Sequence, residues 1–437
     1  MKPRAAWGIF AEFVHSAVGG SVILLACTVA ALVMANSSWR EAYDHLLHAR
    51  LGVTVAGHAL DLTLHHWVND GLMAIFFFVV GLEIKREVLV GQLSSVRLAV
   101  LPGSAALGGL LAPAAIYGML NAGGAGAAGW GIPMATDIAF ALGVLALLGS
   151  SVPLSLKVFL TALAIVDDLG AVLVIAIFYT DTIRLWALVA AAGFLGIFFV
   201  LLRVRARPLI LFLPVLGVWV SVFASGLHAT VAGILTAMMV PMKSPLDPAH
   251  FTEVVRTRLV DLTAGGVSRR SLLVDEDKLD AALELYEAAA GLRPPGIAME
   301  RALHPIQAYV VLPLFAFFNA GIAIDGGALA ALTGPISLGV VLGLVLGKPL
   351  GIVLFSWLAV RSGLAGLPAD LSWRILFAVS WLGGIGFTMS LFVSELAFKT
   401  GPALGEAKIG ILAASLLAGA IGYVVLRLAL AAGPRPA

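Results

Sequence analysis

The feature that most constrains this chain is a pair of adjacent aspartates inside an apolar segment. Asp167 and Asp168 lie within residues 160–175, where Thr161 is the only other polar side chain. Such a run is typical of a membrane helix, in which each ionised carboxylate costs roughly 2.5–3.5 kcal/mol on insertion scales. A chain keeps two of them only if they are neutralised, hydrated or used, and carboxylates bind cations and protons. The pair therefore indicates ion transport.

Composition supports a membrane protein. The 437 residues are 60% hydrophobic and 12% charged, whereas about 25% is charged in a typical soluble domain. The mean hydropathy is +1.02. A net charge of +2 is too small to indicate nucleic acid, and a single cysteine, Cys27, excludes intramolecular disulfides and cysteine-based zinc or redox motifs. The first apolar run follows Lys2 and Arg4 and is long enough to span, so we expect an uncleaved first helix.

Apolar runs of about 20 residues predict an all-α polytopic membrane protein with twelve transmembrane helices. The predicted helices lie near 14–35, 69–90, 96–118, 129–149, 153–179, 183–202, 209–224, 227–241, 303–324, 335–360, 372–398 and 408–430. Most of the 27 lysines and arginines fall on the side that carries the N-terminus. The positive-inside rule then places both termini in the cytoplasm.

The chain divides into two membrane halves, 1–241 and 303–437, joined by a cytoplasmic acidic loop, 242–302. Between Lys243 and Glu300 lie 10 of the 25 acidic residues. Within this loop, residues 275–291 predict a surface helix with an apolar face, formed by Leu279, Ala282, Leu283 and Tyr286. The loop has no catalytic constellation and is interpreted as a solvated elaboration.

An outward segment at about residues 50–65 alternates apolar and polar positions around a glycine-bearing turn. This pattern predicts a β-hairpin, with an irregular loop as the alternative. An isolated hairpin is marginally stable in water, so we expect it to pair with a second protomer.

Four charged residues lie near mid-depth of the predicted helices: Asp137, Asp167, Asp168 and Lys348. A shared depth indicates one site with an internal counter-ion, and the alternative is a set of structural ion pairs. Adjacent helical residues point about 100° apart, so one aspartate can pair with Lys348 while the other faces water. Coupled acids release their protons in linked steps, as exchange of protons for cations at the same oxygens requires.

Two predicted helices carry residues that interrupt helical structure. Residues 129–137 of the fourth helix contain two glycines and Pro133, and the eleventh contains Gly383, Gly384 and Gly386. Paired interrupted helices are typical of inverted-repeat transporters. Asp137 can then offset the positive half-helix ends and Lys348 the negative ones. The alternative is that these glycines only permit close helix packing.

Five segments together resemble the signature motifs of NhaA-type sodium/proton antiporters, in order along the whole chain. They are Gly81–Glu87, Ala135–Gly143, Ala164–Gly170, Leu346–Gly351 and Gly383–Ser390. The resemblance implies a bacterial inner-membrane antiporter in which Asp167 and Asp168 bind cations and protons. It places Thr136 and Asp137 at a helix crossing and gives Lys348 an aspartate partner. It also implies electrogenic exchange of two protons per sodium ion, acceptance of lithium, and a homodimer formed through the outward hairpin.

The same resemblance implies a pH-response cluster with an uneven match. Its members would be Glu83, Lys85, Arg86, Glu87, His228, Glu300 and His304. The family pattern has a histidine where this chain has Arg301, and the acidic loop lies just upstream, so the pH profile is the least constrained property. The alternative interpretation of these charges is a helix-end salt-bridge network.

Other functions have weaker support. The outward histidines, His45, His48, His65 and His66, do not by themselves support a metal site, and no cofactor is expected. The sequence contains neither a P-loop nor a nucleophile elbow, so we expect no enzyme activity. Two alternatives are a sodium-coupled symporter of an organic anion and a passive cation channel. A symporter needs a polar substrate cavity, and a channel needs a polar helix stripe.

Overall fold

The computed structural model describes residues 3–55, 58–180, 183–204, 206–244, 246–263, 266, 275–324 and 327–432. Most of these residues are helical, and a two-stranded antiparallel sheet completes the secondary structure of the described chain. Seven helices are long and apolar enough to cross a membrane, and the count rises to nine if each of two bent helix pairs is one crossing. The predicted all-α membrane class with a small sheet is confirmed.

The first part of the chain, through residue 239, contains both strands. Its elements are α1 (Pro3–Ala35), α2 (Arg40–His48), β1 (Arg50–Val55), β2 (His58–Thr63), α3 (Leu64–His66), η1 (Trp67–Leu72), α4 (Met73–Val90), α5 (Val96–Asn121), η2 (Ala127–Met134), α6 (Ile138–Leu147), η3 (Gly149–Ser151), α7 (Leu154–Phe178), α8 (Leu185–Arg203), α9 (Pro208–Ser225) and α10 (Thr230–Met239).

The second part contains only helices among its described residues. They are α11 (Pro248–Thr263), α13 (Glu276–Gly291), α14 (Pro295–Ile306), η4 (Gln307–Val311), α15 (Leu312–Asn319), α16 (Ala328–Leu332), α17 (Pro335–Leu342), η5 (Gly343–Gly347), α18 (Lys348–Arg361), α19 (Trp373–Gly383), α20 (Phe387–Phe398) and α21 (Pro402–Ala431). The π-helical turns η4 and η5 continue directly into α15 and α18, so each belongs to one longer helix.

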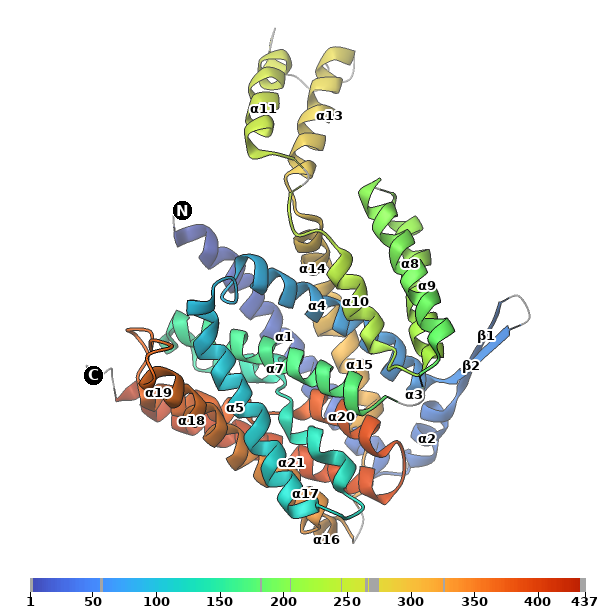
Figure 1. Cartoon of the computed structure of the whole chain (residues 1–437), viewed down its shortest axis with the longest axis vertical. Coiled ribbons are helices and arrows are strands. Elements are labelled where there is room, and N and C mark those ends of the chain that lie inside the picture. Colours follow the sequence, from blue (N-terminus) through green and yellow to red (C-terminus); the bar gives the residue numbers. More distant parts are fainter. Residues whose placement is uncertain are drawn as a thin grey trace.

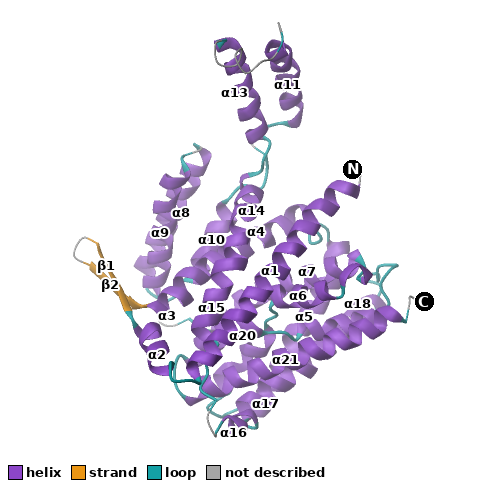
Figure 2. Ribbon diagram, turned by 180° about the vertical axis from the view of Figure 1, so that it is seen from behind, coloured by secondary structure: helices purple, strands orange, loops and turns teal. Residues whose placement is uncertain are grey.

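The bundle has two ends that carry different elements (Figures 1 and 2). One, called here the hairpin end, carries α2, the two strands and α16. The opposite side carries α11 and α13, which project from the bundle as a helical pair called here the appendage. The chain ends of α1 and α21 lie on one side of the bundle, away from the strands, in both views.

The hairpin prediction agrees with the structure. Strand β1 pairs with β2 so that Leu51 lies opposite Leu62, and the turn residues Ala56 and Gly57 lie outside the described residues. Arg50 Nη1 lies 2.8 Å from Asp61 Oδ2 across the pair. Trp67 Nε1 donates to the carbonyl oxygen of Leu51 at 3.0 Å and anchors the hairpin to η1.

Helices α2 and α11 lie in extramembrane stretches for which the sequence analysis made no helix prediction. The predicted 303–324 helix begins earlier, at Pro295, because proline suits the first helical turn. The predicted surface helix at residues 275–291 is confirmed as α13, and three residues of its apolar face, Leu279, Leu283 and Tyr286, are exposed. The helix instead buries Ala281 and Lys278 where it packs against α11, and Lys278 Nζ donates to the carbonyl oxygen of Gly266 at 2.9 Å.

Close packing of α5 against α18 fixes the wall behind the predicted site. A Cβ atom on Gly108 would lie 2.1 Å from the carbonyl oxygen of Gly351, and one on Gly351 would lie 2.0 Å from that of Gly108. Only glycine permits two backbones to approach this closely. Lys348, one turn before Gly351, is thereby held inside the bundle, where its side chain is fully buried.

Candidate ion-binding site at two helix breaks

Two interrupted segments meet in the middle of the bundle. The 3₁₀-helix η2 ends at Met134, the next three residues are not helical, and α6 begins at Ile138. Helices α19 and α20 are separated by residues 384–386 and bend by 46°. The backbone N–H of Asp137 donates to the carbonyl oxygen of Ile385 at 2.6 Å, so the two breaks are hydrogen-bonded to each other.

Asp137 satisfies the amino ends of both half-helices. Its Oδ1 accepts from the backbone N–H of Phe140 at 3.0 Å, which caps α6. Its Oδ2 accepts from the backbone N–H of Thr388 at 3.1 Å and from the Thr388 hydroxyl at 2.5 Å, which caps α20. The aspartate therefore faces two positive helix ends, and both of its carboxylate oxygens accept hydrogen bonds.

Lys348 compensates the carbonyl end of η2 and the carboxylate of Asp167. Its Nζ donates to the carbonyl oxygen of Met134, the last residue of η2, and lies 2.7 Å from Asp167 Oδ2. Both charged side chains are 0% exposed. The ammonium therefore compensates a carbonyl end and a carboxylate together, which is the condition under which a buried ion pair is tolerated.

Thr136 joins the pair to the second break. Its hydroxyl oxygen lies 2.7 Å from Asp167 Oδ2 and 2.8 Å from the carbonyl oxygen of Gly383. Since the hydroxyl carries a single proton, it can donate to one of these acceptors at a time. A Cβ atom on Gly384 would lie 2.4 Å from the carbonyl oxygen of Leu344. The glycine-rich break therefore also permits close packing, so both interpretations of these glycines apply.

Among the described residues Asp168 has neither the ion pair of Asp167 nor the helix-end hydrogen bonds of Asp137. Its side chain is 2% exposed. Its Oδ1 is buried and accepts no hydrogen bond from the described residues, and the same holds for Asp167 Oδ1. Two carboxylate oxygens on adjacent residues of α7 thus lack the partners that buried oxygens normally have. Carboxylate oxygens of this kind bind protons and hard cations, so these two atoms are the candidate ligands for a transported ion.

A second group of charges lies where α4 approaches α14. Arg86 Nη1 pairs with Glu300 Oε1, and Arg86 Nη2 lies 3.2 Å from Glu87 Oε1. Lys85 Nζ donates to the carbonyl oxygens of Met238 and Val240, both at 2.6 Å, and so caps the end of α10. These contacts form a helix-end network.

A small cavity adjoins this network. It has a volume of about 40 Å³ and lies between α1, α4, α6 and the α14–α15 helix. Glu83, His304 and Gln307 supply its polar lining. Gln307 Oε1 and Glu300 Oε2 are buried without a hydrogen-bond partner among the described residues. A cavity of this size holds a few water molecules, and three of its ten lining residues are polar.

The structure does not place His228 with the other predicted pH-response residues. Its Nε2 lies 3.4 Å from Asp70 Oδ1 and its Nδ1 lies 2.9 Å from the Thr230 hydroxyl. Asp70 precedes α4, whereas Arg86 is near the other end of that helix, about 24 Å away at 1.5 Å per residue. His228 therefore belongs to the hairpin end.

The sequence reasoning missed another buried polar group near the hairpin end. Glu395 Oε1 lies 2.6 Å from Lys408 Nζ and 3.7 Å from His65 Nε2. The same histidine nitrogen lies 3.1 Å from Asn319 Oδ1, and Asn319 and Asn69 exchange amide hydrogen bonds. No motif signals this group, because its members come from four distant segments. The sequence signal that could have revealed the group is Glu395, an acidic residue inside the predicted 372–398 helix.

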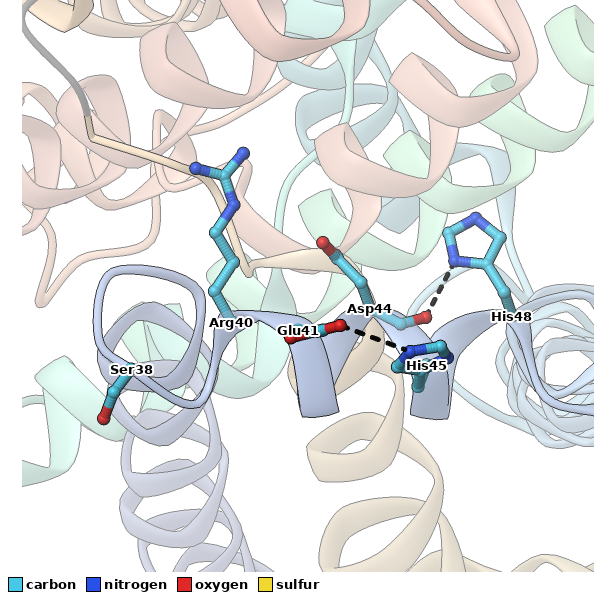
Figure 3. Close-up of a pocket in the computed structure, with 6 residues that line it drawn as sticks. All are labelled: Ser38, Arg40, Glu41, Asp44, His45 and His48. Atoms are coloured by element: carbon cyan, nitrogen blue, oxygen red, sulfur yellow. Dashed lines mark hydrogen bonds and ion pairs between the residues drawn. The ribbon is translucent and has the colours of Figure 1, made fainter.

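An open depression of about 590 Å³ lies along α2 (Figure 3). Its lining includes His45, which faces Glu41 at 3.9 Å, and His48, whose Nδ1 bonds the carbonyl oxygen of Asp44 at 2.8 Å. These side chains lie open to solvent at the hairpin end. No group of three potential metal ligands occurs among the residues that the structure describes.

An apolar helical bundle that buries three aspartates and a lysine at two helix breaks has the architecture of a membrane transport protein. Comparison with known proteins agrees. The family model described as "Na+/H+ antiporter 1" matches residues 11–426. The chain belongs to this family, and the resemblance seen in its motifs is confirmed.

Curated relatives match almost the whole chain. The Na(+)/H(+) antiporter NhaA of Koribacter versatilis is 48% identical over 418 residues, which are 95% of this chain and 90% of that protein. The NhaA proteins of Sulfurimonas denitrificans and Bordetella parapertussis are 46% and 44% identical, with 96% and 97% of this chain and 95% and 98% of theirs covered. The chain is therefore a multi-pass protein of the bacterial inner membrane.

Proposed function

We propose that this chain is a secondary antiporter that exchanges sodium ions for protons at Asp167 and Asp168. Membership of the Na+/H+ antiporter family supports the reaction class. The unpartnered Oδ1 atoms of the two aspartates support the site. Sodium is a hard cation that prefers oxygen ligands. The carboxylates, the Thr136 hydroxyl and the backbone carbonyls exposed at the breaks supply such ligands.

The observation that carries this assignment is the contrast between Asp168 and Asp137. Both are buried, but Asp137 accepts hydrogen bonds from the ends of two helices, whereas Asp168 Oδ1 accepts none among the described residues. An isolated buried carboxylate is strongly destabilised in its ionised form. It must therefore hold either a proton or a cation, and competition of the two for the same oxygens couples their fluxes.

Asp167 has a conditional role in this proposal. While Lys348 pairs with it, its negative charge is compensated. A cation that binds Oδ1 of both aspartates competes with the ammonium for the negative charge of Asp167, because the ammonium and the Thr136 hydroxyl contact Oδ2 of the same carboxylate. We propose that sodium binding is coupled to the loss of one proton from Asp168 and one from the Asp167–Lys348 pair, which gives two protons per sodium ion and hence electrogenic exchange. Lithium, a smaller hard cation, is accepted by the same oxygens.

We further propose twelve crossings with both termini in the cytoplasm. The nine crossings counted by length and composition become twelve with the addition of α4, α9 and α10. Helix α4 carries four charged residues near its end, and α10 has only 10 residues. On this topology the hairpin end faces outward, the appendage is cytoplasmic, and β1–β2 is placed to join two protomers.

Two alternatives fit the same architecture less well. A symporter of organic anions needs a cavity for a multi-atom substrate, but the pocket beside Glu83 measures only about 40 Å³. A passive channel needs a continuous polar stripe, whereas the breaks are surrounded by buried apolar residues of the main core. No observation in the described chain favours either one.

Purified protein in proteoliposomes tests the proposal. An imposed proton gradient should collapse only when sodium or lithium is added, and the rate should change with an applied membrane potential. A proton flux that ignores both cations indicates a channel. Exchange that ignores the membrane potential contradicts the proposed stoichiometry but leaves antiport intact.

A further inference from the structure

We propose that His65, Asn69, Asn319, Glu395 and Lys408 form an outer clasp that holds α20 in place and closes the ion pathway on the hairpin side. The inference rests on the proposed function and orientation, because it assigns this end to the outer face. The clasp joins α3 and η1, α15, α20 and α21 through buried or half-buried polar side chains. No part of the exchange chemistry at Asp167 and Asp168 uses them.

Glu395 lies on the same half-helix as the break, so the clasp and the break are mechanically connected. Helix α20 begins at the break, where Thr388 bonds Asp137, and Glu395 lies eight residues after its first residue. At 1.5 Å per residue, about 12 Å separate the level of the break from the clasp. A single rigid half-helix thus connects the charge-compensated break to a polar attachment nearer the outer face. A displacement at either end has to move the other.

The contacts of Glu395 divide between two neighbours. The ion pair with Lys408, at 2.6 Å, joins α20 to α21. The contact with His65, at 3.7 Å, joins α20 to the segment that precedes α4. His65 in turn bonds Asn319 at the end of α15, which exchanges two amide hydrogen bonds with Asn69. Detaching α20 from α3, η1 and α15 therefore breaks the His65 contact and leaves a buried glutamate with half its partners.

An aromatic group seals the space beneath the clasp. Phe392, three residues before Glu395, is fully buried. Its ring lies 5.5 Å from that of Phe77, 6.1 Å from that of Phe315 and 5.3 Å from the His228 ring. These rings block water between the break and the outer face. Because Phe392 and Glu395 share α20, release of the clasp permits the seal to open.

A thiol-accessibility experiment tests the clasp. Ser394→Cys is a near-isosteric change at a fully buried position beside Glu395, made together with Cys27→Ala so that the chain has one thiol. A membrane-impermeant maleimide is added to the outer side of right-side-out vesicles containing sodium. With the clasp intact the labelling should be slow. Adding Glu395→Gln removes the carboxylate charge from both the Lys408 and the His65 contact, and it should accelerate labelling at least about tenfold.

A matched control separates release of α20 from general loosening. Glu406 lies on α21 near the same end, but its carboxylate accepts from the backbone N–H groups of Ile336 and Ser337, at 2.8 and 3.2 Å, and so caps α17. Glu406→Gln should leave the Ser394→Cys labelling rate unchanged. Equal rates in Glu395→Gln and Glu406→Gln, measured well below the melting temperature of both, overturn the proposal, since a purely structural role lowers only the melting temperature.

A second variant tests the clasp if the Glu395→Gln protein does not insert into the membrane. His65→Gln removes the imidazole from the α3 side of the clasp and leaves the Lys408 pair in place. Faster labelling supports the clasp, and an unchanged rate overturns it. The proposed function is judged separately, by sodium-dependent proton flux of the chain with its clasp intact. Absence of that flux contradicts antiport, whatever the labelling rates.

Discussion

The break region and the appendage contain ion pairs of similar length in opposite surroundings. Lys348 Nζ lies 2.7 Å from Asp167 Oδ2 with both side chains 0% exposed. Arg258 Nε lies 2.5 Å from Glu284 Oε2 with the side chains 39% and 47% exposed. Water screens the second pair, so it contributes little whether made or broken. Inside the bundle the absence of a partner is costly, and in the proposed mechanism that cost makes a cation and a proton compete for one site.

The largest expected effect is that of Asp168→Asn. A neutral amide can neither bind a proton at this site nor neutralise a cation, so sodium-driven proton flux should fall to the level of empty proteoliposomes. The fold should survive because Oδ1 accepts no hydrogen bond among the described residues. Asp370→Asn is the matched control: that exposed carboxylate accepts from the Ser155 hydroxyl at 2.6 Å outside the break region. Wild-type flux in Asp168→Asn vesicles would contradict the site assignment.

Lys348→Ala should affect both stability and transport. It leaves Asp167 and the carbonyl oxygen of Met134 without their shared donor. Breaking one side of a buried pair typically costs about 3–5 kcal/mol in the free energy of unfolding. Thermal unfolding in detergent should therefore show a clearly lower melting temperature, and exchange should be lost. Lys348→Arg keeps the charge and should recover part of the stability. A Lys348→Ala protein that melts with the wild type would argue against the pairing.

Asp137→Ala should have an intermediate effect on stability. It removes the caps of α6 and α20 together, and an N-cap is worth about 0.5–2 kcal/mol each. Asp137→Asn keeps an acceptor oxygen and should retain more of the melting temperature than Asp137→Ala. If both variants lose stability equally, the charge of Asp137 matters more than its hydrogen bonds, and the capping interpretation is incomplete.

The sequence was sufficient to predict the all-α membrane class, because apolar runs follow local rules. Glycines and Pro133 lie in the segments where the described helices break, and acids in apolar runs gave Asp137, Asp167 and Asp168 as candidates. Contacts between residues far apart in the sequence could not be predicted in this way. His65, Asn319 and Glu395 meet only after the bundle assembles. Likewise, the family pattern grouped His228 with Arg86, although His228 contacts Asp70 in η1 before α4 and Arg86 lies near the other end of α4.

The smallest effect is expected from the appendage. Its ends meet: the backbone N–H of Leu246 donates to the carbonyl oxygen of Gly291 at 3.1 Å, and the Ser244 hydroxyl donates to the same oxygen at 2.9 Å. A short Gly/Ser linker can therefore replace residues 247–291 without moving α10 or α14. Breaking the Arg258–Glu284 pair alone, by Arg258→Ala, should leave the melting temperature and the exchange rate unchanged.

The linker variant should exchange ions, with a shifted pH midpoint or apparent sodium affinity. The reason is electrostatic, since the segment between Lys243 and Glu300 holds 10 of the 25 acidic residues and attracts cations toward the proposed inner face. The Debye length is about 8 Å at physiological salt, so the difference between the variant and the wild type should shrink as ionic strength rises. The measurement is sodium-dependent fluorescence dequenching at two salt concentrations. It covers about pH 6 to 9, because histidines and carboxylates with raised pKa values titrate in or near this range. Complete loss of exchange in a correctly inserted linker variant would place the appendage within the transport machinery and erase the contrast with the break region.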